Sequence, residues 1–224
     1  MPAQRTIRVP VAGLAFLAVL IVIAVRIVRG PLLRRPPITA WPLFASAGLW
    51  VLFSVYWSAA AKNSAPAKRS ESRKSRRIHE ALLNVGLLLL FIPVPGMTQR
   101  FLPAGPVFIA TGLGLQIASG LLGVWARRHL GRNWSGEITI KVGHELIRTG
   151  PYRILRHPIY TAMLGMFAGT TLVSGQTHAL LGMVLVVFAH WRKIRLEEAN
   201  LNEAFGPAYD AYRRETWALL PGLF

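Results

Sequence analysis

Long intervals without a charged residue organise the first half of the chain. A segment of about 20 apolar residues spans the hydrocarbon core of a bilayer, so each interval predicts one transmembrane helix. A signal peptide is an alternative for the first interval, but it has no convincing cleavage site and three more intervals follow. The four intervals cover residues 9–25, 36–61, 81–99 and 101–126.

A fifth interval, residues 157–191, runs for 35 residues without Asp, Glu, Lys or Arg. Two full spans need about 40 residues, and a turn signal, Ser174-Gly175-Gln176-Thr177, divides the interval. We therefore expect a tight helical hairpin, with one long tilted helix as the alternative. Together the intervals predict an all-α fold: a polytopic transmembrane bundle of about six spans, the last two forming the hairpin.

The distribution of Lys and Arg between the spans predicts the orientation, because cytoplasmic loops are enriched in both. They are frequent after the second and fourth spans and in the C-terminal tail, whereas the loop after the third span has only Arg100. Both termini are therefore expected in the cytoplasm, with the protein in an inner or plasma membrane. Four arginines after the first span disagree. The basic stretch 62–77 is expected to be a flexible loop near anionic lipids.

Composition supports a membrane protein. The chain is 53% hydrophobic and 16% charged, whereas soluble domains carry about 25% charged residues. The net charge of +17 comes from basic clusters between apolar runs, which is typical of membrane loops and not of a nucleic-acid-binding surface. The absence of Cys excludes disulfides and a Cys nucleophile. The spacing of His129, His144 and His157 matches no standard metal motif, so no metal site is expected.

Acidic residues and histidines are concentrated in the last part of the chain. Seven of the nine acidic residues and five of the six His lie after residue 125. We therefore divide the chain into a scaffold of four spans, residues 1–125, and a polar region, residues 126–224. The second part would contain the hairpin, a cytosolic loop and a C-terminal amphipathic helix.

Residues 130–160 are too polar to span a membrane and too aromatic for a simple linker. Pro158 suits the first turn of a helix, which would place Arg156 and His157 at the membrane surface. A helix N-terminus attracts anions, and these two side chains would add to the attraction. Interfacial snorkelling of the two side chains is the alternative.

Residues 190–217 continue the last span without a helix breaker before Gly206-Pro207. His190 and Glu197 share a helix face, and Arg195 can pair with Glu198 at three residues' distance. The adjacent Glu197 and Glu198 would point about 100° apart. One can therefore face a ligand while the other pairs with a basic residue. The alternative is an ordinary solvated amphipathic helix.

Two ordered motifs in these segments resemble the isoprenylcysteine carboxyl methyltransferases and the related phospholipid methyltransferases. The resemblance covers about residues 125–224, with Leu130-Gly131-Arg132-x-Trp134-Ser135 favouring the first group. The first motif is His144-x-Leu146-Ile147-x-x-Gly150-Pro151-Tyr152-x-x-x-Arg156-His157-Pro158-x-Tyr160. The second is Glu197-Glu198-x-x-Leu201 followed by Phe205-Gly206-x-x-Tyr209-x-x-Tyr212.

This resemblance implies an integral membrane methyltransferase that uses S-adenosylmethionine on its cytosolic side. Basic side chains would suit the cofactor's carboxylate, an acidic one its ammonium or sulfonium, and tyrosines its adenine or cationic region. Arg195 would orient a carboxylate acceptor or pair with Glu198, and a Glu would serve as base for an amine acceptor. The implied cofactor residues are His144, Leu146, Gly150, Tyr152, Arg156, His157, Tyr160, Glu197 and Glu198.

The methyl acceptor is expected to be lipophilic and to come sideways between helices, with the fourth and fifth spans as the rim. Their glycines allow either close packing or a slot. N-methylation of phosphatidylethanolamine or another lipid amine is an alternative, as is an NADPH-dependent sterol-type reductase, which shares a similar Arg-His-Pro pattern. A membrane scaffold or small transporter is a further alternative, but charged residues inside the spans would favour transport and none are present. The glycines are Gly112, Gly114, Gly120, Gly123, Gly165 and Gly169.

Overall fold

The computed structural model describes residues 41–61, 67–134, 139–141 and 145–222. The first predicted span, 9–25, lies outside these residues. The helices are α2 (Trp41–Ala61), α3 (Arg73–Phe91), α4 (Pro106–Leu130), α5 (Pro158–Ser174), α6 (Thr177–Phe205) and α7 (Pro207–Glu215). Short 3-10 helices cover Gly131–Asn133 and Gly150–Arg153, and two short strands are β1 (Ala67–Ser70) and β2 (Thr139–Lys141).

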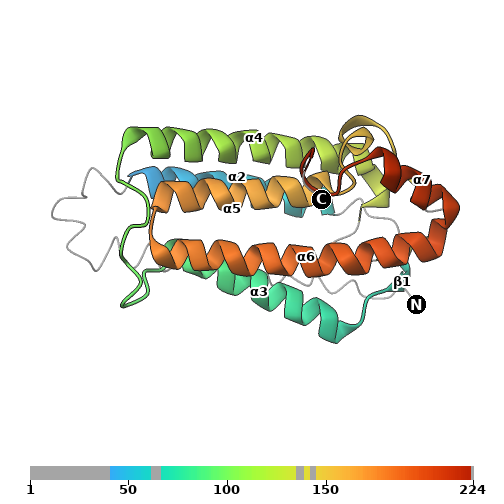
Figure 1. The fold of residues 1–224 in the computed structure, drawn as a ribbon, viewed down its shortest axis with the longest axis horizontal. Coiled ribbons are helices and arrows are strands. Elements are labelled where there is room, and N and C mark those ends of the chain that lie inside the picture. The colour runs from blue at the N-terminus through green and yellow to red at the C-terminus, as the bar shows by residue number, and fades with distance from the viewer. Residues whose placement is uncertain (1–40, 62–66, 135–138, 142–144, 223–224) are drawn as a thin grey trace, which may run out of the picture.

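The helices form an elongated bundle, as the apolar intervals predict. α2, α4 and α5 lie side by side on one side, and α3 lies along α6 on the other (Figure 1). The two strands were not predicted. They pair antiparallel, with Ala67 opposite Lys141, and so join the segment before α3 to the segment after α4.

The basic stretch 62–77 is more ordered than a flexible loop in its described part. Residues 67–70 form β1, and α3 begins at Arg73. Ser72 caps this helix by accepting a hydrogen bond from the backbone N–H of Ser75 at 3.2 Å. A capping Ser satisfies one of the free N–H groups of the first turn, and this signal inside the basic run marks the helix start.

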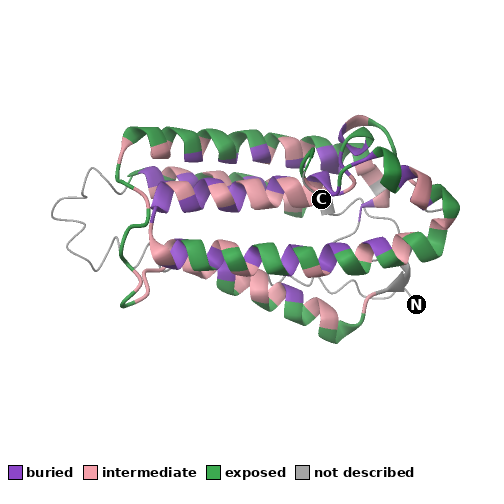
Figure 2. Cartoon of the chain, viewed as in Figure 1, coloured by how far each residue is buried: buried purple, intermediate pink, exposed green. Residues whose placement is uncertain are grey.

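Among the described residues, two helices are long and apolar enough to cross a membrane. They are α2, with mean hydropathy 1.5, and α4, with mean hydropathy 1.8. Both leave large apolar side chains uncovered, among them Leu52 at 69% and Leu121 at 66% exposure. Figure 2 shows such exposed positions along the outer face of α4. An apolar surface of this size is typical of contact with lipid, and the chain is a membrane protein.

The third predicted span does not coincide with a helix. α3 starts before residue 81 and ends at Phe91, so the remaining residues of the interval 81–99 lie outside it. Pro93 and Pro95 explain the early end, because proline disfavours helix in the residue before it and cannot donate the next backbone hydrogen bond. The apolar part of α3 is therefore shorter than the charge-free interval suggested.

The predicted hairpin is present as α5 and α6, which excludes a single long helix. Gly175 ends α5 in the left-handed conformation, with φ +61°. Arg100, the single basic residue of the loop between α3 and α4, donates to the carbonyl of Ser174 at 3.0 Å. A cation at a helix C-terminus is favourable, so Arg100 stabilises the turn of the hairpin.

Glycines bring α4 and α5 into close contact. A Cβ on Gly112 would lie 2.6 Å from the carbonyl oxygen of Gly169, and a Cβ on Gly169 would lie 2.5 Å from that of Gly112. Small residues allow this approach between membrane helices. At Gly112 and Gly169 the structure therefore shows close helix packing and not a slot between the helices. Gly114, in contrast, has open space beside it.

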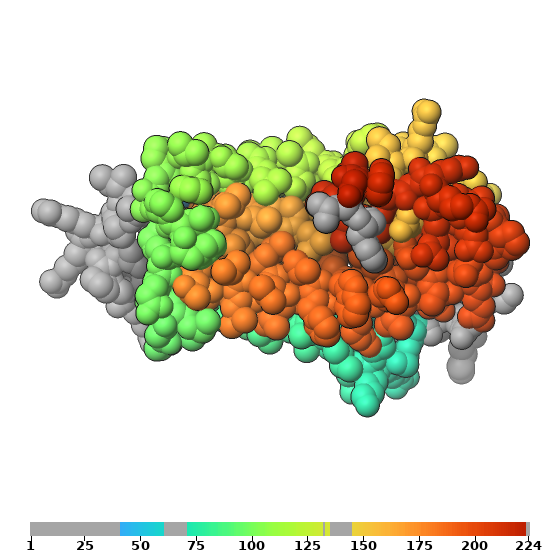
Figure 3. Space-filling model, viewed as in Figure 1, coloured from blue at the N-terminus to red at the C-terminus, as the bar shows by residue number. Residues whose placement is uncertain are grey.

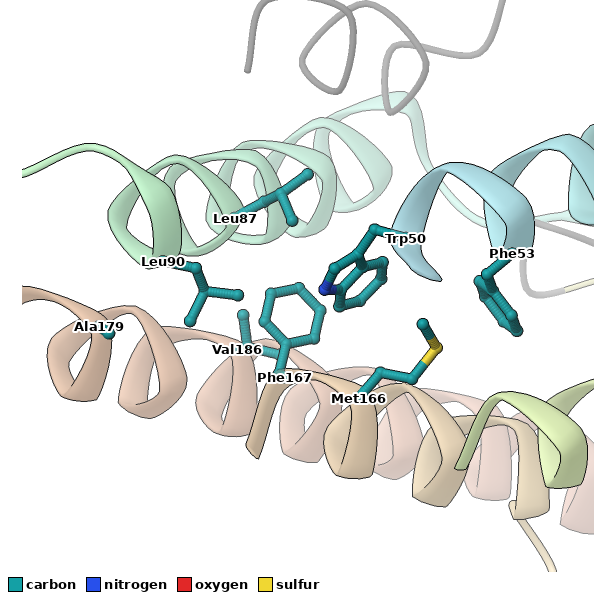
Figure 4. Close-up of a cluster of buried hydrophobic side chains, with 8 residues drawn as sticks. All are labelled: Trp50, Phe53, Leu87, Leu90, Met166, Phe167, Ala179 and Val186. Carbon is teal, nitrogen blue, oxygen red and sulfur yellow. The ribbon is translucent and has the colours of Figure 1, made fainter. Parts of the chain in front are cut away.

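An apolar core fills the space between the two groups of helices (Figure 4). Trp50 packs edge-on against Phe167 with ring centroids 4.8 Å apart, and its indole N–H donates to Thr170 at 3.0 Å. This core occupies the middle of the bundle and leaves the polar chemistry to one end. Its buried members are Trp50, Phe53, Leu87, Leu90, Met166, Phe167, Ala179 and Val186.

Candidate functional site

The polar residues of the two motifs meet at one end of the molecule. There the N-terminus of α5 and the far half of α6 lie beside α7 and the segment after β2 (Figure 3). Pro158 begins α5, as predicted, and α6 continues to Phe205 without interruption. The start of α5 and the fourth to sixth turns of α6 therefore face each other.

Glu198 is held by basic side chains from two other segments. Its Oε1 lies 2.7 Å from Arg156 Nε and 3.3 Å from His157 Nε2, and its Oε2 lies 3.9 Å from Arg213 Nε. Burial alone would raise the pKa of this carboxyl, but the hydrogen bonds from His157 and Arg156 outweigh it and lower the pKa to about 2. Glu198 is therefore a buried carboxylate that is charged at neutral pH and is a poor proton acceptor.

Arg156 joins this carboxylate to the segment after α7. Besides Glu198, its guanidinium donates to the carbonyls of Arg213, at 3.2 Å, and Thr216. The backbone N–H groups of Arg156 and His157 donate to the carbonyls of Trp217 and Ala218 at 2.8 and 3.1 Å. We call residues 154–157, 198 and 213–218 the clasp. The Nε and Nη1 donors of Arg156 are engaged within it, which limits what this side chain can offer a ligand.

Glu197 is in a different position from its neighbour. Tyr160 donates to Glu197 Oε2 at 2.7 Å, and His157 Nδ1 lies 3.9 Å from the same oxygen. The side chain of Glu197 is 32% exposed, against 10% for Glu198. The Tyr160 ring is stacked on His157, with centroids 5.5 Å apart. The two adjacent glutamates therefore differ, as the helix geometry suggested. Glu198 is paired with basic side chains of the protein, and Glu197 is accessible to a ligand.

The turn before α5 forms the next wall. Gly150 has φ +59°, and a Cβ there would lie 2.6 Å from the His129 ring. His129 Nε2 is 2.8 Å from the Thr149 hydroxyl, which fixes the turn to the end of α4. Tyr152 is buried, and burial raises the pKa of its phenol, so it is neutral.

The loop around Leu146 packs against α7. The Arg148 guanidinium lies over the Tyr212 ring, 5.5 Å from its centroid, and donates to the carbonyl of Ala208. The Tyr212 hydroxyl donates to the carbonyl of Tyr152 at 2.7 Å. Leu146 itself is half-buried. These contacts hold α7 beside the site.

Only some of the predicted cofactor residues contact one another. Five of them, Arg156, His157, Tyr160, Glu197 and Glu198, form one contact network. Gly150, Tyr152 and Leu146 belong to the neighbouring turn and loop, and His144 lies outside the described residues.

Arg195 is exposed, and its guanidinium lies 6.0 Å from the centroid of the Trp191 ring. The ion pairs that the structure gives Glu198 go to Arg156, His157 and Arg213 instead. The pairing of Arg195 with Glu198, one of the two roles considered for it, is therefore not observed.

Sequence reasoning missed Tyr209 as a site residue. It is fully buried, and within the described part of the chain its hydroxyl has no hydrogen-bond partner. Burial, and next the charge of Glu198, raise the pKa of its phenol, so the hydroxyl remains a donor beside the acidic pair. Tyr209 and Tyr212, three residues apart on α7, are both buried. The three-residue spacing of these tyrosines was the feature of the sequence that could have indicated a buried face of this helix.

Comparison with known proteins gives a family match for part of the chain. Residues 107–208 match the model of a family described as phospholipid methyltransferase. The matched region is 102 of the 224 residues of the chain. It includes α4, α5, α6 and most of both motifs, and it confirms the resemblance drawn from them.

Individual relatives match the chain over limited lengths. A probable protein-S-isoprenylcysteine O-methyltransferase of Oryza sativa subsp. indica is 33% identical over 79 residues, which is 35% of this chain and 41% of the relative. The nickel-cobalt-cadmium resistance protein NccN of Alcaligenes xylosoxydans xylosoxydans is 32% identical over 106 residues, 46% of this chain and 49% of NccN. The matches thus span less than half the length of these relatives.

Among solved structures, a match was found to the eukaryotic intramembrane Ras methyltransferase ICMT (isoprenylcysteine carboxyl methyltransferase). The TM-score is 0.48 and the sequence identity 16%, covering 97% of this chain and 70% of that one.

Proposed function

We propose that this protein is an integral membrane methyltransferase that moves a methyl group from S-adenosylmethionine to a lipophilic acceptor, as isoprenylcysteine carboxyl methyltransferases do. One observation carries the proposal: the motif residues of α5 and α6 form one network, inside the region that matches the family, and leave Glu197 open. A polar network beside apolar, lipid-facing helices suits a reaction between a water-soluble donor and a membrane-bound acceptor.

The open groups of the site fit this cofactor. Glu197, positioned by Tyr160, offers a carboxylate to the ammonium group of the amino-acid end. Tyr209 offers a hydroxyl donor that has no partner among the described residues. The turn at Gly150, which packs against the His129 ring, would border the adenosine end. When bound, S-adenosylmethionine supplies a methyl group on a positively charged sulfur.

Arg156 and His157 have a different role from the direct contact with the cofactor carboxylate that the motif suggested. Arg156 donates to Glu198 and to backbone carbonyls of the clasp. His157 lies between the two glutamates, 3.3 Å from Glu198 and 3.9 Å from Glu197. We infer that both act by fixing the orientation of Glu197 and by closing the C-terminal segment over the site.

The chemistry needs orientation more than proton transfer. Methyl transfer is an in-line displacement at carbon, and a carboxylate acceptor attacks without losing a proton. Alignment of two reactants can supply several kcal/mol of the barrier reduction, and the clasp would help to exclude water. A pKa of about 2 for Glu198 agrees with an anchoring role for this residue in place of general base catalysis.

The close contact between α4 and α5 changes the expected route of the acceptor. Gly112 and Gly169 bring the two backbones together, so a slot between the fourth and fifth spans is unfavourable there. We infer that the acceptor reaches the site from the α6 side of α5. The exposed apolar side chains of α6, such as Val184 and Phe188, would face lipid along this route.

We also propose the predicted topology of about six spans, with both termini and the cofactor site cytoplasmic. The pairing of β1 with β2 supports it, because it joins the loops after the second and fourth predicted spans at one end of the bundle. The clasp lies at the same end (Figure 1). The division into a scaffold, 1–125, and a cofactor-binding region, 126–224, is part of this proposal.

Binding of labelled S-adenosylmethionine to the detergent-purified protein tests the function. We expect saturable binding by the wild type and by Glu203→Gln, an exposed control on the same helix as Glu197. Glu197→Gln should bind about tenfold more weakly, the effect of losing one charged hydrogen bond.

Three results would count against this proposal. If the folded wild type binds no S-adenosylmethionine, the methyltransferase function is wrong. If it binds NADPH instead, the reductase alternative replaces it. If Glu197→Gln binds as well as Glu203→Gln, the role assigned to Glu197 is wrong.

A further inference from the structure

An open groove lies on the outer face of α4, near the C-terminal end of the helix. One part of it is apolar and is formed by Leu121, Val124 and Trp125, and the other part is formed by Arg128 and His129. Leu121 and Trp125 are exposed, so their side chains contribute little to the packing of the bundle. Spacings of three and four residues place the five side chains on one face of the helix. The groove therefore changes from apolar to basic along the helix axis.

The consecutive basic residues of the last turn of α4 have different surroundings. Arg127 is buried, lies over the Trp134 ring at 4.3 Å from its centroid, and donates to the carbonyls of Gly131, at 2.8 Å, and Ala60. Arg128 is exposed, and it has no hydrogen bond or ion pair with another residue that the structure describes. Because Arg127 already offsets the negative end of the helix dipole, the charge of Arg128 remains available to an anion from outside.

Trp125 indicates the depth of the groove in the membrane. Tryptophan is enriched where the hydrocarbon core meets the lipid headgroups, and Trp125 lies three residues before Arg128 on the exposed face. On α6 the exposed Trp191 is likewise followed by an exposed arginine, Arg195. The end of α4 and the far half of α6 lie at the same end of the bundle (Figure 1). Arg128 is therefore expected at the level of the headgroups and Leu121 at the level of the acyl chains.

The charge of the groove selects among membrane lipids. Its lining contains Arg128 and no carboxylate. A guanidinium binds phosphate oxygens through parallel charged hydrogen bonds, and an anionic phospholipid brings a phosphate whose charge no ammonium cancels. Anionic phospholipids are concentrated in the cytoplasmic leaflet, which is the side proposed for this end of the protein. Charge and depth thus both favour an anionic phospholipid.

His129 connects the groove to the candidate cofactor site. Its ring lines the groove, and its Nε2 lies 2.8 Å from the Thr149 hydroxyl. The same ring fills the space beside Gly150, where a Cβ would lie 2.6 Å from it. Gly150 begins the short 3-10 helix that leads to the motif residues at the start of α5. A ligand that restrains the last turn of α4 would therefore restrain this wall of the site as well.

We propose that an anionic phospholipid of the surrounding membrane binds in this groove and strengthens the binding of S-adenosylmethionine. Its phosphate contacts Arg128, and the upper part of an acyl chain lies on Leu121 and Trp125. The effect on the cofactor rests on the proposed methyltransferase function, whereas the lipid site does not. This lipid is a regulatory ligand and not the methyl acceptor, whose proposed route lies on the α6 side of α5.

Native mass spectrometry of the full chain in detergent tests the lipid site. The probe is phosphatidylglycerol, in competition with an equal amount of phosphatidylcholine. We expect the wild type to prefer phosphatidylglycerol about tenfold, and Arg128→Gln to lose this preference with the charged hydrogen bonds to the phosphate. Glycerol phosphate should not displace the lipid, because it has no acyl chain for the apolar part of the groove.

Arg77→Gln is the matched control for Arg128→Gln. Arg77 is also an exposed arginine, and it lies in the first turns of α3, outside the groove. Its replacement removes the same charge from the protein, so it reports any general attraction between a basic surface and anionic lipid. This variant should keep the wild-type preference for phosphatidylglycerol. Circular dichroism of both variants verifies that they are folded.

Binding of labelled S-adenosylmethionine in lipid nanodiscs tests the effect on the cofactor. We expect the wild type and Arg77→Gln to bind it about fivefold more tightly in discs that contain phosphatidylglycerol than in phosphatidylcholine alone, a modest coupling between two sites. Arg128→Gln should lose this gain. S-adenosylmethionine is itself a cation that an anionic membrane concentrates. Displacement by S-adenosylhomocysteine, which has no net charge, is therefore measured in the same discs.

The outcomes separate the lipid site from its effect and from the proposed function. Equal preference for phosphatidylglycerol in Arg128→Gln and Arg77→Gln would overturn the lipid site, and displacement by glycerol phosphate would replace the lipid with a free phosphate ester. Equal gains in cofactor affinity in the two variants would overturn the regulatory effect. If the folded wild type binds no S-adenosylmethionine in either membrane, the methyltransferase function and the regulatory effect are both wrong, while a retained phosphatidylglycerol would still support the lipid site.

Discussion

The polar end of the helical bundle and its apolar middle are held together by different forces. At the polar end, residues more than 40 positions apart in the chain meet through charged hydrogen bonds, such as Arg156 with Glu198. In the middle, Trp50, Phe167 and Leu90 pack by shape, and glycines bring α4 against α5. The first region depends on particular side chains and the second on volume. Ligand binding and stability should therefore respond to different substitutions.

The largest expected effect comes from breaking the clasp. Arg156→Ala leaves the carboxylate of Glu198 buried without its strongest partner, which should lower the free energy of unfolding by about 4 kcal/mol. Thermal unfolding in detergent measures this loss. The double variant Arg156→Met/Glu198→Leu should recover part of it, because no unpaired charge remains. A loss below about 1 kcal/mol in Arg156→Ala would mean that the clasp is solvated.

A cavity in the apolar middle should cost slightly less and should not affect the site. Leu90 is fully buried in the core between the helix groups, and Leu90→Ala is expected to lower the free energy of unfolding by about 3 kcal/mol. The affinity of the folded protein for S-adenosylmethionine should stay unchanged. A matched loss of affinity would show that the core and the clasp are coupled, and would end the separation of the two regions.

Acid should act on the polar end first. Folding lowers the pKa of Glu198 from 4.5 to about 2, so this carboxyl stabilises the protein above its unfolded pKa and loses that contribution as the pH falls from 4.5 toward 2. We expect a loss of about 2 kcal/mol, which allows for partial screening by solvent. Unfolding curves between pH 6 and 3 measure it. Arg156→Met/Glu198→Leu, which has no such carboxyl, should show a flatter profile.

The smallest effect separates ligand binding from stability. Tyr209→Phe removes a hydroxyl that has no partner among the described residues, so the folded protein should keep its stability or gain slightly. The affinity for S-adenosylmethionine should fall about tenfold, because one hydrogen bond to the ligand is lost. Equilibrium binding and thermal unfolding of the same sample check both. Unchanged affinity would exclude Tyr209 from the cofactor site.

The sequence predicted the two regions unequally, for physical reasons. Charge-free intervals and a Gly-containing turn were enough to predict α2, α4 and the hairpin of α5 with α6, because these depend on local composition. The interval 81–99 did not predict the limits of α3, because the helix begins at the Ser72 cap and ends before the prolines that follow residue 91. The short strands depend on a contact between distant segments, which a single sequence does not reveal.

For the site, the motifs predicted which residues belong together but not what each one contacts. Glu197 and Glu198 were expected to divide their roles, and the structure decides which is paired internally. The hydrogen bonds of Arg156 to backbone carbonyls depend on the return of residues 213–218, and no residue spacing in the sequence predicts this contact. Tyr209 became visible because its buried hydroxyl has no hydrogen-bond partner among the described residues, which only coordinates can show.

The return of the segment 216–218 to the start of α5 has a consequence for how the protein matures. Trp217 pairs with residues 154–156, about 60 positions earlier in the chain. During synthesis Trp217 leaves the ribosome after the hairpin of α5 and α6. The clasp is therefore expected to form only after the hairpin has been made. Competence to bind its cofactor would arrive in a final step, when the late segment docks and fixes Arg156 on Glu198.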